Sequence, residues 1–364
     1  MLNLSQLITQ LPAMQPYIAD TFSKSIVHLE KLWQACSARS NEIIFSDLKY
    51  RGTSVSEPYN YFGDVPLKRH DGLYRVVGID GSQIYPDRHE GVNIYLINIG
   101  SVVLGYGPDK SDASFYSQPF VYSNSGLSSI SVRFIDALRH DHELKHGVKC
   151  IENQSQQTLL FYDGSLLWWD LRTQQDTIVE EFLPDYCESI SKLYALGAHI
   201  AGYTSMPASK DIIHLLQAYY EYSLGEIFEE NIISEADALL LQKVLPTGHV
   251  TNLFKSAADI ARWYPQAMHP YFCYINTGTE IARIEIPAWI AHNQLIYTNV
   301  ITAVWDQVCK GYGYPVVLSE AHAQAVVSGV DREKFFALVH EYARQQGYVY
   351  QRSSKLMRKR VLYA

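Results

Sequence analysis

Cysteine is scarce in this sequence of 364 residues, and its scarcity excludes two classes of protein. The cysteines are odd in number and scattered: Cys36, Cys150, Cys187, Cys273 and Cys309. A small disulfide framework or a zinc knuckle needs closely spaced pairs, so we expect neither. The pattern favours a protein of the reducing cytoplasm.

A long hydrophobic run is also missing. The most apolar stretch, 92–105, is interrupted by Asn93, Asn98, Gly100 and Ser101. It therefore predicts a strand, a turn and a second strand rather than a membrane span. The N-terminus has no basic region followed by an apolar run, so we expect no signal peptide and a cytoplasmic location.

Positive charge is in deficit, with 30 Lys and Arg against 38 Asp and Glu, a net charge of −8 and a pI near 5.9. This balance argues against a protein that coats nucleic acid through bulk electrostatics, although a nuclease with a local basic groove is still compatible with it. The sequence also lacks a phosphate-binding loop with Lys-Ser/Thr, a GxGxxG before a helix, a GxSxG elbow and an HExxH helix. The commonest nucleotide, hydrolase and zinc-protease sites are therefore not expected.

The tripeptide Asp-Gly-Ser, which occurs twice, is the most informative feature that is present. Asp80 follows the apolar run 74–79, and Asp163 follows the apolar run 158–162. An Asp-Gly pair alone is a common turn, but each of these predicts a buried strand that ends in a carboxylate with a glycine turn behind it. Neighbouring carboxylates repel each other, and hard divalent cations prefer oxygen ligands, so the pair indicates a metal site.

The segments around the two tripeptides predict a β-β-β-α-β series. The strands are expected over 74–80, 92–99, 102–106 and 158–163, and the helix over 127–147. This order opens a ribonuclease H-like fold, so the predicted class is α/β, with a mixed sheet flanked by helices. A right-handed crossover would place the last strand parallel to and beside the first. Asp80 and Asp163 would then lie side by side at the carboxyl ends of their strands.

The rest of the chain predicts further helices over 185–197, 209–223, 234–244, 297–310, 319–328 and 332–346, and strands over 198–203, 271–276, 281–287 and 314–318. Residues 1–47 are expected to be helical, interrupted by Pro12 and Pro16, and residues 51–72 to form a linker or exposed loop. The predicted organisation is an N-terminal helical extension with linker over 1–65, a main α/β domain over 66–350 and a basic tail over 351–364. The cations of that tail either contact phosphates or form a solvated terminus: Arg352, Lys355, Arg358, Lys359 and Arg360.

The helix between the two tripeptides is expected to supply a third carboxylate. Asp136, His140 and Glu143 share one helical face at the spacing i, i+4 and i+7. Glu143 is the preferred candidate and Asp136 the second. The alternative is an ordinary solvated face beside Arg133 and Arg139.

Two C-terminal residues are further candidates. The segment 313–322 predicts a strand entering a helix, with His322 near the start of that helix. A neutral imidazole there could ligate a metal or act as a base, and Tyr314 could donate a hydrogen bond to a phosphate. In the strand 281–287, Arg283 and Glu285 alternate with apolar residues, which predicts a half-exposed strand.

Taken together, these segments resemble the NurA family of DNA repair nucleases. The resemblance spans about residues 75–335 and rests on several pieces in the family's order: Gly78-Ile-Asp-Gly-Ser82, Phe161-Tyr-Asp-Gly-Ser-Leu166, Ala201-Gly-Tyr-Thr-Ser-Met-Pro207, Arg283-Ile-Glu-Ile-Pro287, and Gly313-Tyr-Pro-Val-Val-Leu-Ser-Glu-Ala-His322 running on to Asp331-Arg-Glu333.

The resemblance implies a function and a set of site residues. It implies that Asp80, Glu143 and Asp163 hold manganese and that Tyr314 and His322 complete the site. It also implies a ribonuclease H-like homodimer that digests DNA from 5′ to 3′ with the hexameric ATPase HerA. The match is loose around 139–143, where Asp141 is another candidate for the helix carboxylate.

The chemistry of phosphodiesters suggests how such a site works. Two divalent ions about 3.5–4 Å apart can activate a water and stabilise the leaving oxygen. Asp80 would bridge both ions, Glu143 and Asp163 would complete one each, and His322 would ligate or shuttle a proton. Manganese accepts a nitrogen ligand better than magnesium, the alternative ion.

Two other functions compete with the nuclease. One is a catalytically inactive scaffold of the same fold that docks DNA or a translocase. The other is an unrelated hydrolase that uses paired carboxylates on sugars. The nuclease is preferred because a scaffold has no need to hold repelling carboxylates together, and because both acids are predicted at strand ends.

Overall fold

The structure is a computed structural model, and it describes residues 2–14, 21–38, 55–70, 72–107, 112–123, 130–154, 157–168, 176–224, 236–348 and 353–354. The described strands form one mixed sheet of nine strands in the order β1-β7-β8-β9-β6-β5-β2-β3-β4. The chain divides into two compact units: residues 1–69 with 202–297, and residues 70–201 with 298–364. Each unit is described by itself.

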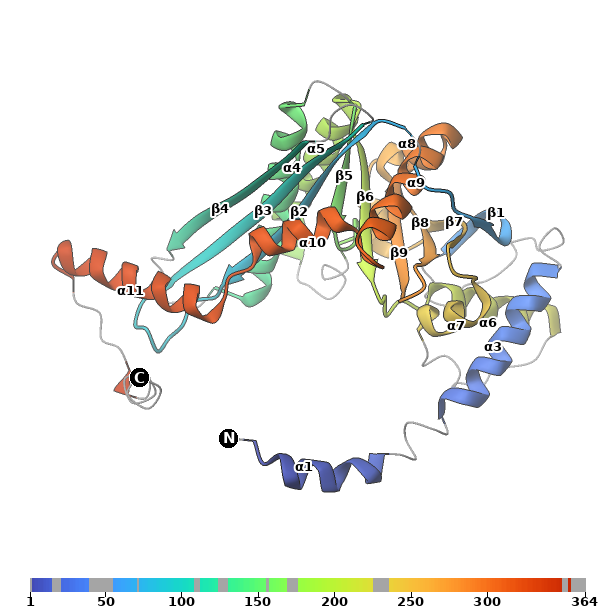
Figure 1. Cartoon of the computed structure of the whole chain (residues 1–364), viewed down its shortest axis with the longest axis horizontal. Helices are drawn as coiled ribbons and strands as arrows, with labels where there is room; N and C mark the ends of the chain where they lie inside the picture. The colour runs from blue at the N-terminus through green and yellow to red at the C-terminus, as the bar shows by residue number, and fades with distance from the viewer. Residues whose placement is uncertain are drawn as a thin grey trace. The chain divides into compact units, whose positions relative to one another are not determined.

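The second unit contains the strands of the predicted β-β-β-α-β series, which Figure 1 draws in blue to green. They are β2 (Tyr74–Ile84), β3 (Ile94–Tyr106), β4 (Asp112–Ser123) and β5 (Thr158–Asp163). The pairs β2–β3 and β3–β4 are antiparallel, whereas β2 and β5 are parallel. The order β5-β2-β3-β4, with one parallel pair after an antiparallel meander, is the ribonuclease H-like arrangement, and the predicted fold class is confirmed.

The strand–turn–strand predicted over 92–106 was wrong. Residues 94–106 form the single strand β3, and the third strand of the meander is β4, which the sequence analysis missed. Gly100 interrupts the apolar run for a packing reason, because a Cβ there would lie 2.3 Å from the backbone nitrogen of Ala325. The sequence did not predict strand β4 because this strand lies at the end of the sheet, and its exposed polar residues resemble those of a loop.

Helices cover both faces of β2. Helix α4 (Val132–Glu152) begins at Ser131, whose hydroxyl accepts a hydrogen bond from the backbone N–H of Phe134 at 3.1 Å. It packs on β2, β5 and α5 (Asp176–Ala195). Helix α10 (Val316–Ala325) packs on β2 and β3 and is followed by α11 (Gly329–Gln345).

The strand predicted over 314–318 was wrong, because α10 begins there at Val316. The backbone turns through Tyr312 and Gly313, both with positive φ, and Pro315 then caps the helix. A short apolar run does not distinguish a buried helix from a buried strand. Helix α9 (Gln294–Lys310) anchors this turn, since the Gln307 side chain accepts a hydrogen bond from the N–H of Val317 at 3.1 Å.

The first unit is built from α1 (Leu4–Gln10), the 3₁₀ turn η1 (Leu11–Met14), α3 (Thr21–Ala38), β1 (Val55–Pro66), β6 (His199–Ser205, which begins in the second unit), α6 (Asp211–Leu224), α7 (Asp237–Val244), β7 (His249–Ser256), the 3₁₀ turns η6 (Asp259–Trp263) and η7 (Gln266–Met268), β8 (Pro270–Asn276), β9 (Ile281–Pro287) and α8 (Ala288–Ala291). Its core packs α3, α6 and α7 against β7 and β8, with Leu29, Leu216, Leu240 and Phe254 buried.

Part of the expected linker 51–72 is a strand. Residues 55–66 form β1, which pairs antiparallel with β7, and β7 itself was also missed. Glycine and proline suggested a loop, but β1 lies at the end of the sheet and its register is irregular, positions that tolerate both residues. The predicted domain boundaries after residues 65 and 350 stay predictions.

Strand β9 is buried on both faces, so the half-exposed strand predicted there was wrong. Arg283 and Glu285 are nearly inaccessible, and their side chains form an ion pair of 2.8 Å between Nε and Oε1. The Arg283 guanidinium also pairs with Asp211 and stacks 3.7 Å from the centre of the Phe272 ring. Charges are tolerated in this core because each has an opposite partner within contact distance.

The same cluster contains a further acid, Asp237, which accepts hydrogen bonds from the Tyr274 hydroxyl at 2.7 Å and from the N–H of Ile213 at 3.0 Å. Burial, followed by the charge of Asp211, raises the pKa of Asp237 to about 7. An aspartate in the unfolded chain titrates near 4. The folded protein therefore holds an extra proton between about pH 4 and 7.

We predict that the free energy of unfolding falls as the pH rises from about 4 to 7, because the folded state must give up this proton. The Asp237→Asn variant should show a smaller decline, since an amide has no proton to lose. The control, Asp259→Asn, changes an exposed acid and should decline as the wild type does. Urea unfolding at pH 5 and pH 8 measures the difference, and equal declines in Asp237→Asn and wild type would contradict the prediction.

A substitution at Gly100 tests how closely α10 packs against the sheet. We predict that Gly100→Ala destabilises the protein by about 1–3 kcal/mol, the usual cost of overpacking, because its Cβ would lie 2.3–2.4 Å from backbone atoms of α10. Gly329→Ala is the matched control, since nothing lies within 4 Å of the added Cβ and alanine favours the helix. Thermal melts that rank the two variants alike would refute this account.

Candidate active site

The two Asp-Gly-Ser aspartates lie side by side in the second unit. The parallel register pairs Ile79 with Tyr162, so the next residues, Asp80 and Asp163, are neighbours at the end of the paired segment. The predicted turn is present only in the second tripeptide, where β5 ends at Asp163 and Gly164 has φ of +127°. In the first tripeptide the predicted turn was wrong, because β2 continues to Ile84.

Gly81 has a packing role instead of a turn role. A Cβ at this position would lie 2.5 Å from Oε1 of Glu143 and 2.9 Å from Cγ of Arg139. The missing side chain thus lets helix α4 bring its polar groups against β2 immediately after Asp80.

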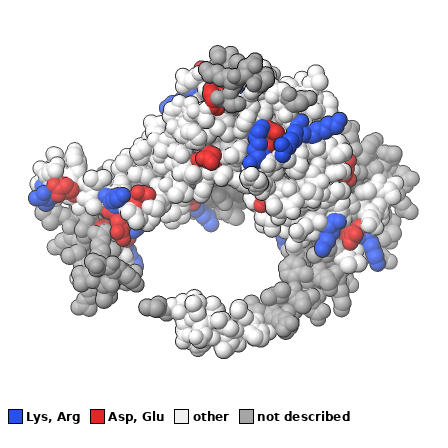
Figure 2. Space-filling model, viewed as in Figure 1, with Lys and Arg blue, Asp and Glu red and all other residues white. Residues whose placement is uncertain are grey.

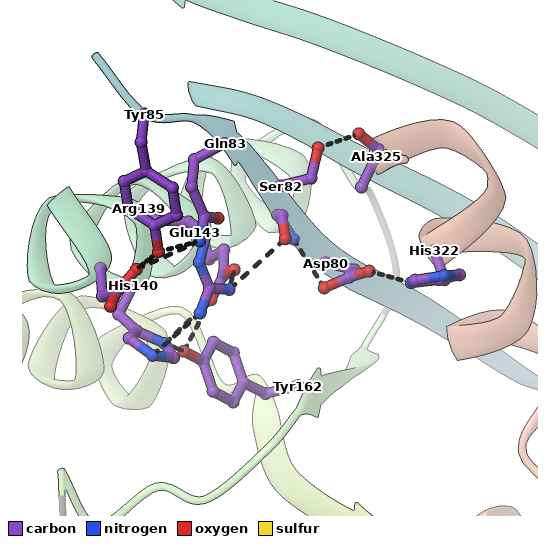
Figure 3. A network of polar contacts seen from close by, with 12 residues as sticks. Asp80, Ser82, Gln83, Tyr85, Arg139, His140, Glu143, Tyr162, His322 and Ala325 are labelled. Atoms are coloured by element: carbon purple, nitrogen blue, oxygen red, sulfur yellow. Dashed lines mark hydrogen bonds and ion pairs between the residues drawn. The ribbon is translucent and has the colours of Figure 1, made fainter. Parts of the chain in front are cut away.

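The alternation of side chains along β2 divides the site between two faces. Asp80 and Ser82 face α10: Nδ1 of His322 lies 2.7 Å from Oδ2 of Asp80, and Ser82 bonds the carbonyl of Ala325. Figure 3 shows Asp80 and His322 on one side of the strand, and Glu143 with its partners on the other. The predicted residues are therefore gathered around β2, but not on a single surface.

Tyr314, which was predicted to belong to the site, donates a hydrogen bond to the carboxylate of Asp163. Burial, followed by the charge of Asp80, raises the pKa of Asp163 to about 6, against the opposing effect of Tyr314. Burial and then the charge of Glu143 likewise raise the pKa of Asp80, against the hydrogen bond from His322. The two carboxylates are thus short of positive charge.

Glu143 is fully buried and has several donors. Oε1 accepts from Arg139, whereas Oε2 accepts from the Tyr162 hydroxyl at 2.7 Å and lies 3.2 Å from Nδ1 of His140. Burial raises the pKa of Glu143, but the charges of Arg139 and His140 outweigh it and lower the pKa below its ordinary value.

The other two candidates for the helix carboxylate point elsewhere. Asp136 accepts hydrogen bonds from Tyr85 and, at 3.1 Å, from Gln83. Asp141 pairs with Lys145 at 2.9 Å, and Lys145 continues to Asp185 on α5. Of the three acids, Glu143 lies against the strand segment that carries Asp80.

Arg139 and Tyr162 were missed as parts of the site. A solvated face beside Arg139 was the alternative interpretation, but only 17% of the Arg139 side chain is exposed. A signal for both was present in the sequence, since Arg139 precedes Glu143 by one helical turn and Tyr162 directly precedes Asp163.

The candidate side chains meet the requirements of a divalent cation site only in part. Asp80 and Asp163 offer adjacent carboxylates with raised pKa values, which a cation would stabilise. Both oxygens of Glu143, however, already accept hydrogen bonds from neighbouring side chains. Within the described ranges, no three His, Cys, Asp or Glu side chains converge closely enough to hold an ion.

Other sequence predictions are only partly covered by the described residues. The cations of the basic tail, Arg352 and Lys355 to Arg360, lie outside them. In the part of the chain that is described, no helix is both long and apolar enough to cross a membrane. On the face drawn in Figure 2, the Lys and Arg side chains lie among Asp and Glu side chains.

We predict that Asp80→Asn makes the metal-free protein more stable, by about 1 kcal/mol, because it removes one of the crowded like charges. The same change should reduce the stabilisation gained from manganese, since that gain follows the affinity of the folded state for the ion. The exposed acid Glu333 supplies the control, Glu333→Gln.

Thermal melts of each protein with manganese and with chelator test this. The idea fails if the wild-type melting temperature does not respond to manganese, or if Asp80→Asn responds just as strongly.

Comparison with known proteins gives the family. No curated protein matches the sequence. Among solved structures, a crystal structure of NurA aligns with a TM-score of 0.41 and 11% identity over 75% of this chain and 90% of that chain. One of NurA bound to dAMP and manganese aligns with a TM-score of 0.37 and 11% identity over 85% and 94%. The family model of the NurA domain matches residues 74–327, most of the chain and all the candidate residues, and the protein therefore belongs to the NurA family.

Proposed function

We propose that this protein is a metal-dependent DNA nuclease, a phosphodiester hydrolase with 5′–3′ exonuclease or single-strand endonuclease activity. The observation that carries the proposal is the pair of adjacent carboxylates, Asp80 and Asp163, of which the first is buried and the second half-buried, and which are short of positive charge. Membership of the NurA family supports it independently of the geometry.

The candidate residues have different parts in this proposal. Asp80, Asp163, Glu143 and His322 would hold the cation, which supplies an activated water and stabilises the leaving oxygen. Tyr314 orients Asp163 through their hydrogen bond and lies ready to meet a phosphate. The hydrogen bond between His322 and Asp80 fixes the imidazole next to the carboxylate pair, and its largely exposed ring can exchange protons with water.

Manganese is the proposed ion, with two ions in the site, and magnesium is the alternative. Crystal structures of NurA proteins contain manganese, and one also contains dAMP. The donor set of carboxylates with one imidazole suits manganese better than magnesium, since manganese accepts nitrogen ligands more readily.

A second candidate function is an inactive scaffold of the same fold that docks DNA or a translocase. The observation in its favour is the engagement of Glu143 by Arg139, which leaves the described donors without a converging ligand set. The raised pKa values of Asp80 and Asp163 favour the enzyme, because a scaffold gains nothing from holding these charges together.

The proposed setting is DNA end processing and double-strand break repair in the cytoplasm, as a homodimer that works with a HerA-type hexameric ATPase. The acidic net charge supports a need for a partner that feeds the DNA strand. The basic tail is a proposed contact with phosphates. Light scattering tests the dimer, and digestion of long duplexes with and without the ATPase tests the partnership.

We predict that Asp80→Ala and Asp163→Ala each abolish manganese-dependent cleavage of DNA, while the protein stays folded, because each removes a ligand and not a core group. On helix α4, Glu143→Gln should lose activity and Asp136→Asn should keep it, since Asp136 points toward Tyr85. The assay uses single- and double-stranded DNA labelled at either end, with manganese, magnesium or chelator.

The position of the label in the first products gives the polarity of digestion. Normal cleavage by purified Asp80→Ala or Asp163→Ala would refute the site. Cleavage that persists in chelator would refute the metal dependence.

A further inference from the structure

We propose that Arg139 is the internal counter-ion of Glu143 and that a divalent cation must displace its guanidinium, so that Arg139 sets the metal affinity of the site. The inference rests on the proposed metal-dependent function and assigns to Arg139 a positioning role that acts through Glu143.

The first step is the occupancy of Glu143. Arg139 and Glu143 are one turn apart on α4, and the Arg139 guanidinium donates to Oε1. The other oxygen accepts from the Tyr162 hydroxyl at 2.7 Å. A cation that is to share Glu143 with Asp80 therefore has to compete with a donor that is already in place.

The second step is the position of the guanidinium. In addition to its contact with Glu143, Nη1 of Arg139 lies 3.5 Å from the carbonyl oxygen of Gly81, the residue that follows Asp80. Figure 3 shows the same sequence of contacts, from Glu143 through Arg139 toward the strand that carries Asp80. The positive charge thus lies beside the helix carboxylate and against the strand segment that follows Asp80, and Asp80 is among the charges that raise the pKa of Arg139.

The third step is how completely the Arg139 guanidinium is hydrogen-bonded. The Nε atom of Arg139 is buried and has no hydrogen-bond partner in the described part of the chain. The two terminal nitrogens are engaged: Nη1 donates to Glu143, and Nη2 lies 3.2 Å from Nε2 of His140. A buried donor without a partner is unfavourable, and a divalent ion has twice the charge of a guanidinium. The Arg139 contact is therefore one that a bound ion can replace.

The test compares manganese binding by isothermal titration calorimetry in wild type, Arg139→Gln and Arg133→Gln, each stripped with chelator. Arg133 is an exposed arginine on the same helix and serves as the matched control. We expect Arg139→Gln to bind manganese roughly three- to tenfold more tightly, because one competing ion pair is gone. Arg133→Gln should bind as the wild type does.

Thermal melts provide the second readout. The melting temperature of metal-free Arg139→Gln should fall, because Glu143 loses its counter-ion, and its rise on adding manganese should exceed that of the wild type. If Arg139→Gln does not melt cooperatively, Arg139→Met, which keeps the apolar stem, replaces it with the same expectations.

The outcomes separate the two proposals. A purely structural arginine would hold Glu143 in place, so its removal would leave manganese affinity unchanged or weaken it, and either result would overturn the inference while the nuclease proposal stands. A wild type that binds no manganese would overturn both.

Discussion

Helices pack closely on both faces of β2 and on its neighbour β3 only because glycines in these two strands leave room for them, and the rest of the candidate site depends on this constraint. Gly78 and Gly100 leave room for the backbone of α10, and Gly81 leaves room for Glu143 and Arg139 of α4. Since successive side chains point to opposite faces, the same strand presents Asp80 to one helix and receives Glu143 from the other. Close packing thereby brings groups from distant parts of the chain to one segment.

The two units treat buried charge differently. In the first unit, Arg283 pairs with two acids and stacks on an aromatic ring, although burial and the charge of Asp211 raise the pKa of Asp237 in the same cluster. In the second unit, the side-chain donors to Asp80 and Asp163 among the described residues are a histidine and a tyrosine, and both pKa values are raised. The proposed function draws on the adjacent positions of Asp80 and Asp163, because neighbouring carboxylates with raised pKa values are typical of functional sites.

Much of the fold could be predicted from the sequence because its signals are local. The runs before Asp80 and Asp163 are continuous and apolar, as parallel and central strands require. The end strands β1 and β4 were missed because their residues resemble loops, and the start of α10 was mistaken for a strand because a short apolar run fits both.

The sequence by itself determined which residues are candidates and, through the β-β-β-α-β order, that Asp80 and Asp163 become neighbours. It also predicted that a helix acid joins them, but it left three acids as candidates. Only the tertiary structure decided among these, because the direction of a side chain depends on what packs against its helix. It also decided that Gly81 is a contact and not a turn, that Arg139 is paired with Glu143, and that Arg283 is buried. Each depends on distances between segments far apart in the chain, which no local pattern encodes.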